Sequence, residues 1–410
     1  MTEFSQADYE DADPLGIGVV CADTDTFTSL QVIFRCVILP TVCLTGIFCN
    51  LVNTYVFAQK AMRKQSFNLF FLFLSMSDAV VLISAMIVFV LPAIAELVDW
   101  LPLKNASIRI LLVFYPIGQV ALTASVYLTV MVTFHRYIAV CHPFTAARHY
   151  YGSKIVVGLI VVVILFANLF NTTRWLELSL TICYNMRHKL YEIEILPTEL
   201  MMARSYTIYY RNTAYTTMLF FVPFVALVYF NLRICMAVKK SEKFTEAFSP
   251  RDTAQYSPDG GQKSPRPMTP KDGRRGRSQS RDINRMLTSI IVLFLMSNSL
   301  GLFNNILELM EISTGDNTLD TGLVELSSFF VNINAAATTI IYWKFGTKYR
   351  CIVKKALFSL FGFNWCRPAN LLGQHRQYNW AEGRSTVAKY TEPSSVKKEF
   401  LSSNECPVQF

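Results

Sequence analysis

Charged residues are scarce in this chain. Asp, Glu, Lys and Arg together make up 16% of its 410 residues, whereas a soluble globular domain carries about 25%. Hydrophobic residues make up 52% of the chain, and its mean hydropathy is +0.33. So few charges cannot cover the surface of a soluble protein of this size, and much of the surface must therefore face lipid. The composition predicts a membrane protein.

Positive charge is absent from the first 30 residues. They contain no Lys or Arg but seven acidic residues: Glu3, Asp8, Glu10, Asp11, Asp13, Asp23 and Asp25. An acidic start without a basic region before an apolar core is not typical of a secretory signal peptide. The basic residues behind the net charge of +9 gather in particular connections and in the tail. This pattern indicates membrane topology rather than a nucleic-acid partner.

The sequence also lacks the motifs of common enzyme classes. It has no zinc-ligand spacing, no nucleophile elbow and no phosphate-binding loop, and its five histidines are scattered. We therefore expect no catalysis, no metal centre and no cofactor. A membrane transporter is the non-receptor alternative. It would need mid-membrane charges in several helices or inverted repeats, and the second apolar run contains a single acidic residue, Asp78.

Seven apolar runs are long enough to cross a bilayer, which takes about 20 residues per helix. They cover residues 32–58, 67–93, 108–134, 154–173, 212–236, 285–307 and 322–343. Each run is bounded by charges or by polar, Pro/Gly-rich sequence. We expect an all-α fold, a seven-transmembrane helix bundle.

Lys and Arg follow the first, third, fifth and seventh runs, so this side is predicted to be cytosolic. The expected organisation is an extracellular acidic tail (1–30), a seven-transmembrane domain (31–343), a cytosolic amphipathic helix (344–362) and a disordered cytosolic tail (363–410). Within the membrane domain, residues 239–283 read as a disordered third cytosolic loop, because their low apolar content cannot build a core. The expected location is the plasma membrane.

Three short patterns point to modification or binding outside the bundle. Ser/Thr-Pro pairs begin at Ser249, Ser257, Ser264 and Thr269 in the third loop, where phosphorylation and a solvated spacer are both open. The C-terminal Val408-Gln409-Phe410 has the pattern of a PDZ ligand. Asn105-Ala106-Ser107 is a glycosylation sequon, provided that it stands clear of the bilayer.

The stretch from Ser125 to Pro143, SVYLTVMVTFHRYIAVCHP, is apolar until His135-Arg136-Tyr137. It resembles the cytoplasmic end of helix three in rhodopsin-like G-protein-coupled receptors, and most of all in invertebrate FMRFamide-type neuropeptide receptors. The resemblance covers roughly residues 45–350. Its other matches are Asn50, Asp78 in LSMSD, Pro223, Phe294 and Tyr342.

Asp78 must face the bundle interior, because an isolated carboxylate in lipid costs several kcal/mol. Its candidate partners are Asn50, Ser125 and Asn334. The resemblance implies that these residues hold a sodium ion that favours the inactive state. A purely structural hydrogen-bond network is the alternative.

The resemblance implies a G-protein-coupling switch built from His135, Arg136, Tyr137, Tyr342, Phe294 and Asn298. Here the sequence departs from the class. His135 replaces the acid that usually pairs with the arginine, the helix-seven motif has lost its asparagine and proline, and Asn298 occupies the place of the switch tryptophan. The protein is therefore either a receptor with altered switches or a weakly coupled decoy. Without the ion pair, we expect ligand-independent activity.

Cys183 also lacks its usual disulfide partner, because the helix-three cysteine of the class is replaced by Leu111. A bridge from Cys183 to Cys21 is a hypothesis.

The resemblance also narrows the ligand. Gly118 stands where aminergic receptors have an aspartate, and Asn332 where opsins have their lysine. We expect a cationic, C-terminally amidated peptide, drawn by acidic outer connections; a small-molecule chemosensory receptor is the alternative. The expected pocket residues are Tyr115, Gln119, Arg174, Trp175, Glu177, Asn305, Glu308 and Asn332. The other expected partners are a heterotrimeric G protein, kinases and arrestin, and membrane lipids.

Overall fold

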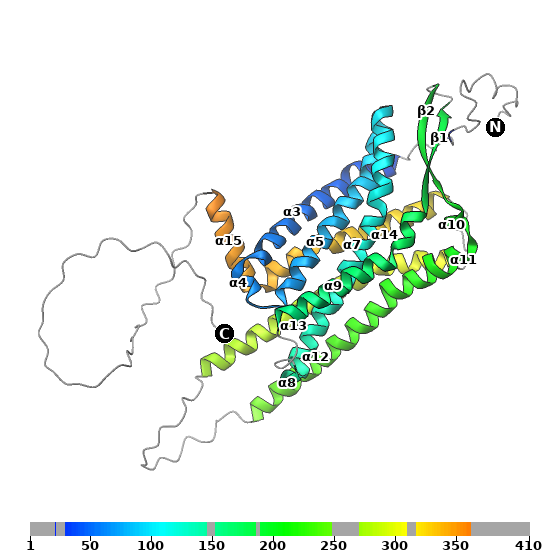
Figure 1. Cartoon of the computed structure of the whole chain (residues 1–410). Coiled ribbons are helices and arrows are strands. Elements are labelled where there is room, and N and C mark those ends of the chain that lie inside the picture. The colour runs from blue at the N-terminus through cyan, green and yellow to red at the C-terminus, as the bar shows by residue number, and fades with distance from the viewer. Residues whose placement is uncertain are drawn as a thin grey trace, which may run out of the picture. The chain divides into compact units, whose positions relative to one another are not determined.

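The computed structural model describes residues 21, 29–145, 152–185, 189–247, 270–309 and 317–361. The chain divides into two units, Met1–Gly346 and Thr347–Phe410. The first unit contains the helix bundle shown in Figure 1. The described part of the second unit is one helix, α15 (Thr347–Phe361), which covers most of the amphipathic helix expected at 344–362.

The described residues contain seven helices that are long and apolar enough to cross a membrane, which confirms the predicted number. Helix one comprises α2 (Ser29–Ile33), η1 (Phe34–Ile38) and α3 (Leu39–Ala58), and helix two α5 (Asn68–Ala85), η2 (Met86–Val90) and α6 (Leu91–Val98). Helix three is α7 (Leu101–Cys141), and helix four is α9 (Ser153–Phe170) followed by η4 (Thr172–Leu176). Helix five comprises α11 (Arg204–Tyr206), η5 (Thr207–Ala214), η6 (Thr217–Phe221) and α12 (Val222–Ala247), helix six is α13 (Pro270–Leu309), and helix seven is α14 (Asn317–Phe345). The short helices are α4 (Lys60–Arg63), α8 (Pro143–Thr145) and α10 (Glu199–Met202).

Proline explains where three of these helices widen into π turns. The segments η1, η2 and η6 each end two residues before a proline, at Pro40, Pro92 and Pro223 respectively. Proline has no N–H to bond the carbonyl four residues earlier, and a π turn accommodates the interrupted ladder. Pro223 thus determines where helix five contains the π turn η6.

Helices three, five and six extend beyond the bounds expected from the sequence. Helix three runs over Leu101–Cys141, beyond the expected 108–134 at both ends. Arg136 therefore lies inside the helix rather than at its mouth. The third loop is also shorter than 239–283, because α12 continues to Ala247 and α13 begins at Pro270. Their charged ends belong to the helices because Lys, Glu and Arg are good helix formers. The Ser/Thr-Pro serines and Thr269 lie outside the described residues.

The structure contains a β-hairpin between helices four and five, which the expected all-α fold did not include. Strands β1 (Leu178–Asn185) and β2 (Leu190–Pro197) pair antiparallel, with Cys183 opposite Glu192. The stretch Tyr191–Leu196 reads YEIEIL, the two-residue alternation of a half-buried strand. In Figure 1 the hairpin projects from one end of the bundle, called here the hairpin end.

A disulfide and hydrogen bonds hold the hairpin. A disulfide joins Cys21 to Cys183, and the Cys21 amide donates a hydrogen bond to the Tyr184 carbonyl (3.1 Å). The Ile193 amide donates to Asn105 Oδ1 (2.9 Å). Asn105, the predicted glycosylation site, thus lies in helix α7 and contacts β2, where it helps to position the hairpin.

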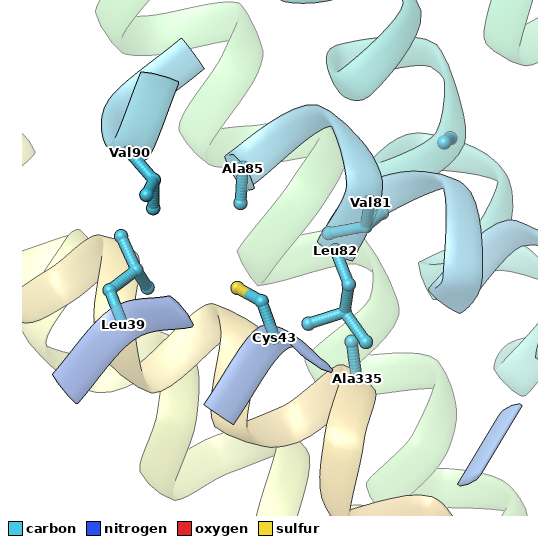
Figure 2. Packing of buried hydrophobic residues seen from close by; sticks show 8 residues of the cluster. Leu39, Cys43, Val81, Leu82, Ala85, Val90 and Ala335 are labelled. Carbon is cyan, nitrogen blue, oxygen red and sulfur yellow. The ribbon is translucent and has the colours of Figure 1, made fainter. Parts of the chain in front are cut away.

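The core between helices one, two and seven is closely packed. Figure 2 shows Leu39 of α3 facing Val90 and Cys43 of α3 facing Ala85 and Leu82, all three from helix two, with Ala335 of α14 beside Leu82. Helix one approaches helix seven so closely that a Cβ at Gly46 would lie 2.7 Å from the Ala336 Cβ. A second cluster joins helices three, five and six around Phe294, which is 2% exposed. These contacts fix the relative positions of the helices that line the cavity described below.

Candidate functional site

A cavity of about 840 Å³ opens among helices two to seven toward the hairpin end. Five of the predicted pocket residues line it: Tyr115, Gln119, Arg174, Asn305 and Asn332. Helix three contributes the first two, which are four residues apart and so share a face. Two of these side chains bond to helix five: Gln119 Oε1 accepts from the Tyr215 hydroxyl (2.7 Å), and Asn305 Nδ2 donates to Thr216 Oγ1 (2.9 Å).

One wall of the cavity is backed by a buried ion pair. Arg174 Nη1 lies 2.9 and 3.1 Å from the two oxygens of Glu177, which is fully buried. The hydroxyls of Tyr115 (2.7 Å) and Tyr206 (2.8 Å) donate to the same carboxylate. The Arg174 guanidinium also lies 4.7 Å from the Tyr215 ring centroid. This network joins helix three, the end of helix four and helix five.

Three predicted pocket residues do not belong to the described lining. Trp175 is 50% exposed and does not line the cavity, because the 3₁₀ turn η4 places it on a different side from its neighbour Arg174. Glu177 lies behind the lining, occupied by the pair just described. The Glu308 side chain lies outside the described residues. Among the described lining residues, the charged ones are Arg174 and Arg211, and none is acidic.

The sequence interpretation missed several lining residues. They are Ser84, Arg211, Asn212, Tyr215 and Asn304, and the predicted switch residue Asn298 lines the cavity as well. The polar run RNTAY at 211–215 was the available signal in helix five. Gly118 also lines the cavity, and a Cβ there would lie 2.9 Å from the Ser84 Cβ. Glycine at this position therefore lets helices two and three meet at the cavity.

The buried Asp78 carboxylate, 1% exposed, faces the bundle interior and accepts a hydrogen bond from Ser125 Oγ (2.5 Å). Asn50 instead donates to the Ala335 carbonyl (2.9 Å), and no hydrogen bond joins Asp78 to Asn50 or Asn334, all three being described. Asp78 Oδ2 and Ser75 Oγ are buried without hydrogen-bond partners among the described residues. Carboxylate and hydroxyl oxygens are hard donors, which suit a hard cation. The residues present therefore fit a sodium ion.

Aromatic rings surround the predicted switch residues at the far end of helix three, called here the Arg136 end. The Arg136 guanidinium lies 3.7 Å from the centroid of the Phe67 ring. The buried His135 ring lies 5.9 Å from Phe70 and 6.5 Å from Phe67. The structure thus places aromatic side chains around the position where the class usually has an acid.

The other predicted switch residues fall into separate environments. Tyr342, 2% exposed, makes edge contacts with the rings of Phe57 and Phe71, both at 5.2 Å. The Tyr137 hydroxyl hydrogen-bonds His142 Nε2 (3.2 Å). Phe294 lies in the core of helices three, five and six. His135 and Arg136 therefore share Phe67, which precedes helix two, whereas Tyr342 contacts Phe57 of helix one and Phe71 of helix two.

Known proteins resemble this chain over the part that contains both the cavity and Arg136. The family described as 7 transmembrane receptor (rhodopsin family) matches residues 49–342. The FMRFamide receptor of Drosophila melanogaster is 26% identical over 328 residues, which cover 77% of this chain and 52% of that receptor. An FMRFamide peptide receptor of Caenorhabditis elegans is 27% identical over 326 residues, covering 78% of this chain and 68% of its own length. This chain spans about half the length of the Drosophila relative.

The family match covers the cavity, the buried Asp78 and the Arg136 end, and it confirms the resemblance noted in the sequence. Its members are receptors rather than enzymes. This chain is a multi-pass membrane protein and belongs to the rhodopsin family of seven-transmembrane receptors.

Proposed function

We propose that this protein is a receptor for an extracellular FMRFamide-like peptide and transmits binding to a heterotrimeric G protein. The observation that carries the proposal is the cavity of about 840 Å³ at the hairpin end, together with relatives named for FMRFamide. Ligand sites commonly measure about 300–1,000 Å³. A cavity of this size takes the terminal residues of a peptide, and the rest of the peptide extends toward the hairpin.

The proposed orientation places the hairpin and the N-terminus outside the plasma membrane. The basic connections after helices one, three, five and seven support it, because cytosolic loops carry the excess of Lys and Arg. The Arg136 end then faces the cytosol, where the G protein binds. Kinases and arrestin at the third loop and tail, and a PDZ protein at Val408-Gln409-Phe410, are proposed for segments outside the described residues.

Several outer acids are already paired and so contribute less to peptide attraction than we expected. Lys104 Nζ lies 2.9 Å from Asp99 and 3.2 Å from Glu96, and Arg35 pairs with Glu325. The acids of β2, Glu192 and Glu194, lie on the hairpin. Because the described cavity lining contains no acidic residue, we assign the attraction of a cationic peptide to the hairpin rather than to this lining.

The proposed mechanism is a shift between two populations of the bundle. A peptide end in the cavity contacts helices three, five, six and seven, and it favours the arrangement that opens the Arg136 end. Asp78 lies on helix two between the two ends. Asp78, Ser125 and Ser75 would hold a sodium ion there, which would supply positive charge to the carboxylate and so favour the inactive arrangement.

The test is agonist-dependent nucleotide exchange. Membranes from cells expressing the full chain are exposed to Phe-Met-Arg-Phe-amide and related amidated peptides, and GTP-analogue binding to G proteins is measured. The expected result is a saturable increase that mock-transfected membranes lack. Absence of peptide binding and exchange, with the protein present at the cell surface, overturns the proposal. A response to small molecules alone favours the chemosensory alternative.

A further inference from the structure

The guanidinium of Arg174 is only partly used by the protein. Its three hydrogen bonds, to both Glu177 oxygens and to the Tyr115 hydroxyl, all use Nη1. Arg174 Nε is buried without a hydrogen-bond partner among the described residues. Arg174 lines the cavity, whereas Glu177 lies behind it. Glu177 therefore holds the arginine from the side away from the cavity. The N–H groups of Arg174 other than those on Nη1 remain available as donors to a ligand.

Aromatic rings fix the direction of this guanidinium. Its central carbon lies 4.7 Å from the Tyr215 ring centroid and 5.6 Å from that of Tyr210. A planar guanidinium that is stacked on rings and bonded to a carboxylate loses little further freedom when it binds a ligand. Glu177 is itself held by the Tyr115 and Tyr206 hydroxyls. The wall is thus preorganised.

Glu177 determines the charge that this wall presents. An unpaired arginine in a site of low dielectric would attract a carboxylate strongly. With the Glu177 carboxylate in contact with Nη1, the pair has no net charge, and it presents N–H donors to the ligand. Arg211 also lines the cavity, but it has interactions of its own within the protein.

Another part of the lining, on α13 and α14, presents acceptors. Asn304 Nδ2 donates to the Leu323 carbonyl and Asn332 Nδ2 to the Ser328 carbonyl, each at 2.9 Å. A carbonyl can only accept, so these bonds identify which amide atom is nitrogen. The Oδ1 atoms of both residues are buried without partners among the described residues. Such oxygens suit an N–H donor and disfavour a carboxylate.

We propose that Arg174 binds the carbonyl oxygen of an uncharged terminal carboxamide, and that Glu177 is the positioning residue that makes this site select the amide over the free acid. Without Glu177, the same guanidinium would favour the acid. This inference rests on the proposed peptide-receptor function.

The experiment measures competition binding of two synthetic peptides that differ only at the C-terminus, Phe-Met-Arg-Phe-amide and the corresponding free acid. The receptor variants are Glu177→Gln, the milder Glu177→Asp and the double variant Glu177→Gln/Arg174→Gln. Glu325→Gln is the matched control, because Glu325 is a second buried glutamate paired with an arginine but does not line the cavity. Surface expression is measured for each.

In the wild type, the amide is expected to bind more tightly than the acid. Glu177→Gln should shift the ratio of the two affinities toward the acid by about tenfold, the scale of a hydrogen bond to a charged group. Glu177→Asp should shift it in the same direction by less, and removing Arg174 as well should abolish the shift. A merely structural role would weaken both peptides equally.

An unchanged ratio in Glu177→Gln overturns the inference, and if that variant does not reach the surface, an unchanged ratio in Glu177→Asp does so. A shift of equal size in Glu325→Gln also overturns it. If the wild type binds neither peptide, the proposed function itself fails and the inference falls with it. If the wild type binds the amide but the variants leave the ratio of amide to acid affinity unchanged, the inference fails and the proposed function stands.

Discussion

The Arg136 guanidinium stacks over the Phe67 ring, with its central carbon 3.7 Å from the ring centroid. Phe67 immediately precedes α5, so the ring connects helix three to the start of helix two. Cation–π contacts contribute about 0.5–1 kcal/mol at exposed sites and about 2 kcal/mol when desolvated. We infer that this contact restrains Arg136 where the class uses an acidic neighbour.

Replacing Phe67 should raise ligand-independent signalling. Phe67→Leu keeps an apolar side chain but removes the ring, so Arg136 loses its cation–π contact and is restrained less. Basal nucleotide exchange per surface receptor should rise about three- to tenfold, the equivalent of the cation–π contact. Phe48→Leu is the control, since Phe48 is 66% exposed on helix one. Equal basal activity in Phe67→Leu and the wild type would count against this restraint.

Restoring an acid beside Arg136 should have the opposite effect. His135→Asp allows an ion pair worth on the order of 1 kcal/mol, and basal exchange should fall a few-fold. Because His135 is buried among Phe67 and Phe70, some loss of expression is expected, and activity must be divided by surface receptor number. His135→Asn is a neutral control for side-chain size. A fall of the same size in His135→Asn would show that charge is not the cause.

Asp78 should make agonist affinity depend on sodium. Asp78→Asn removes the negative charge and keeps a side chain that reaches Ser125. In the wild type, raising sodium should lower agonist affinity several-fold, and in Asp78→Asn this dependence should disappear. Choline chloride at equal ionic strength separates the specific ion effect from screening. Retention of the full sodium effect in Asp78→Asn would place the ion elsewhere.

The disulfide between Cys21 and Cys183 should stabilise the hairpin end. Removing it with Cys21→Ser should lower the thermal midpoint of the detergent-purified protein by several degrees, since a disulfide contributes about 2–4 kcal/mol. Cys183→Ser and the double variant should give the same decrease, because either change breaks the same bond. Cys36→Ser, at a free cysteine, is the control. Peptide mapping without reductant that finds Cys21 and Cys183 as free thiols would contradict this pairing.

The bundle was predictable because lipid constrains a chain strongly. Every backbone polar group must be paired within the membrane, so each long apolar run forms a helix. The lengths of the runs predicted the seven crossings. The β-hairpin was not predicted because it lies outside the membrane. There, a short alternation of polar and apolar residues can belong either to a strand or to a loop.

The candidate site was only partly predictable. Tyr115, Gln119 and Asn332, which the sequence placed on helices three and seven, line the cavity. Trp175 and Glu177 do not belong to the described lining; they lie in and just after the 3₁₀ turn η4, where neither a helical nor a strand period applies. Arg211 precedes the expected fifth run, 212–236, and Asn212 begins it; both lie in the π segment η5 and line the cavity.

The sequence by itself determined the membrane class, the number of crossings and the need for Asp78 to face inward, because hydrophobicity and chain length are local properties. Tertiary structure alone decided that Tyr115 and Tyr206 donate to the Glu177 carboxylate and that Phe67 receives Arg136. These partners come from different turns or different helices, and their meeting depends on how the helices are rotated and packed. Charge and aromatic contacts act over a few ångströms, so only that packing assigns them.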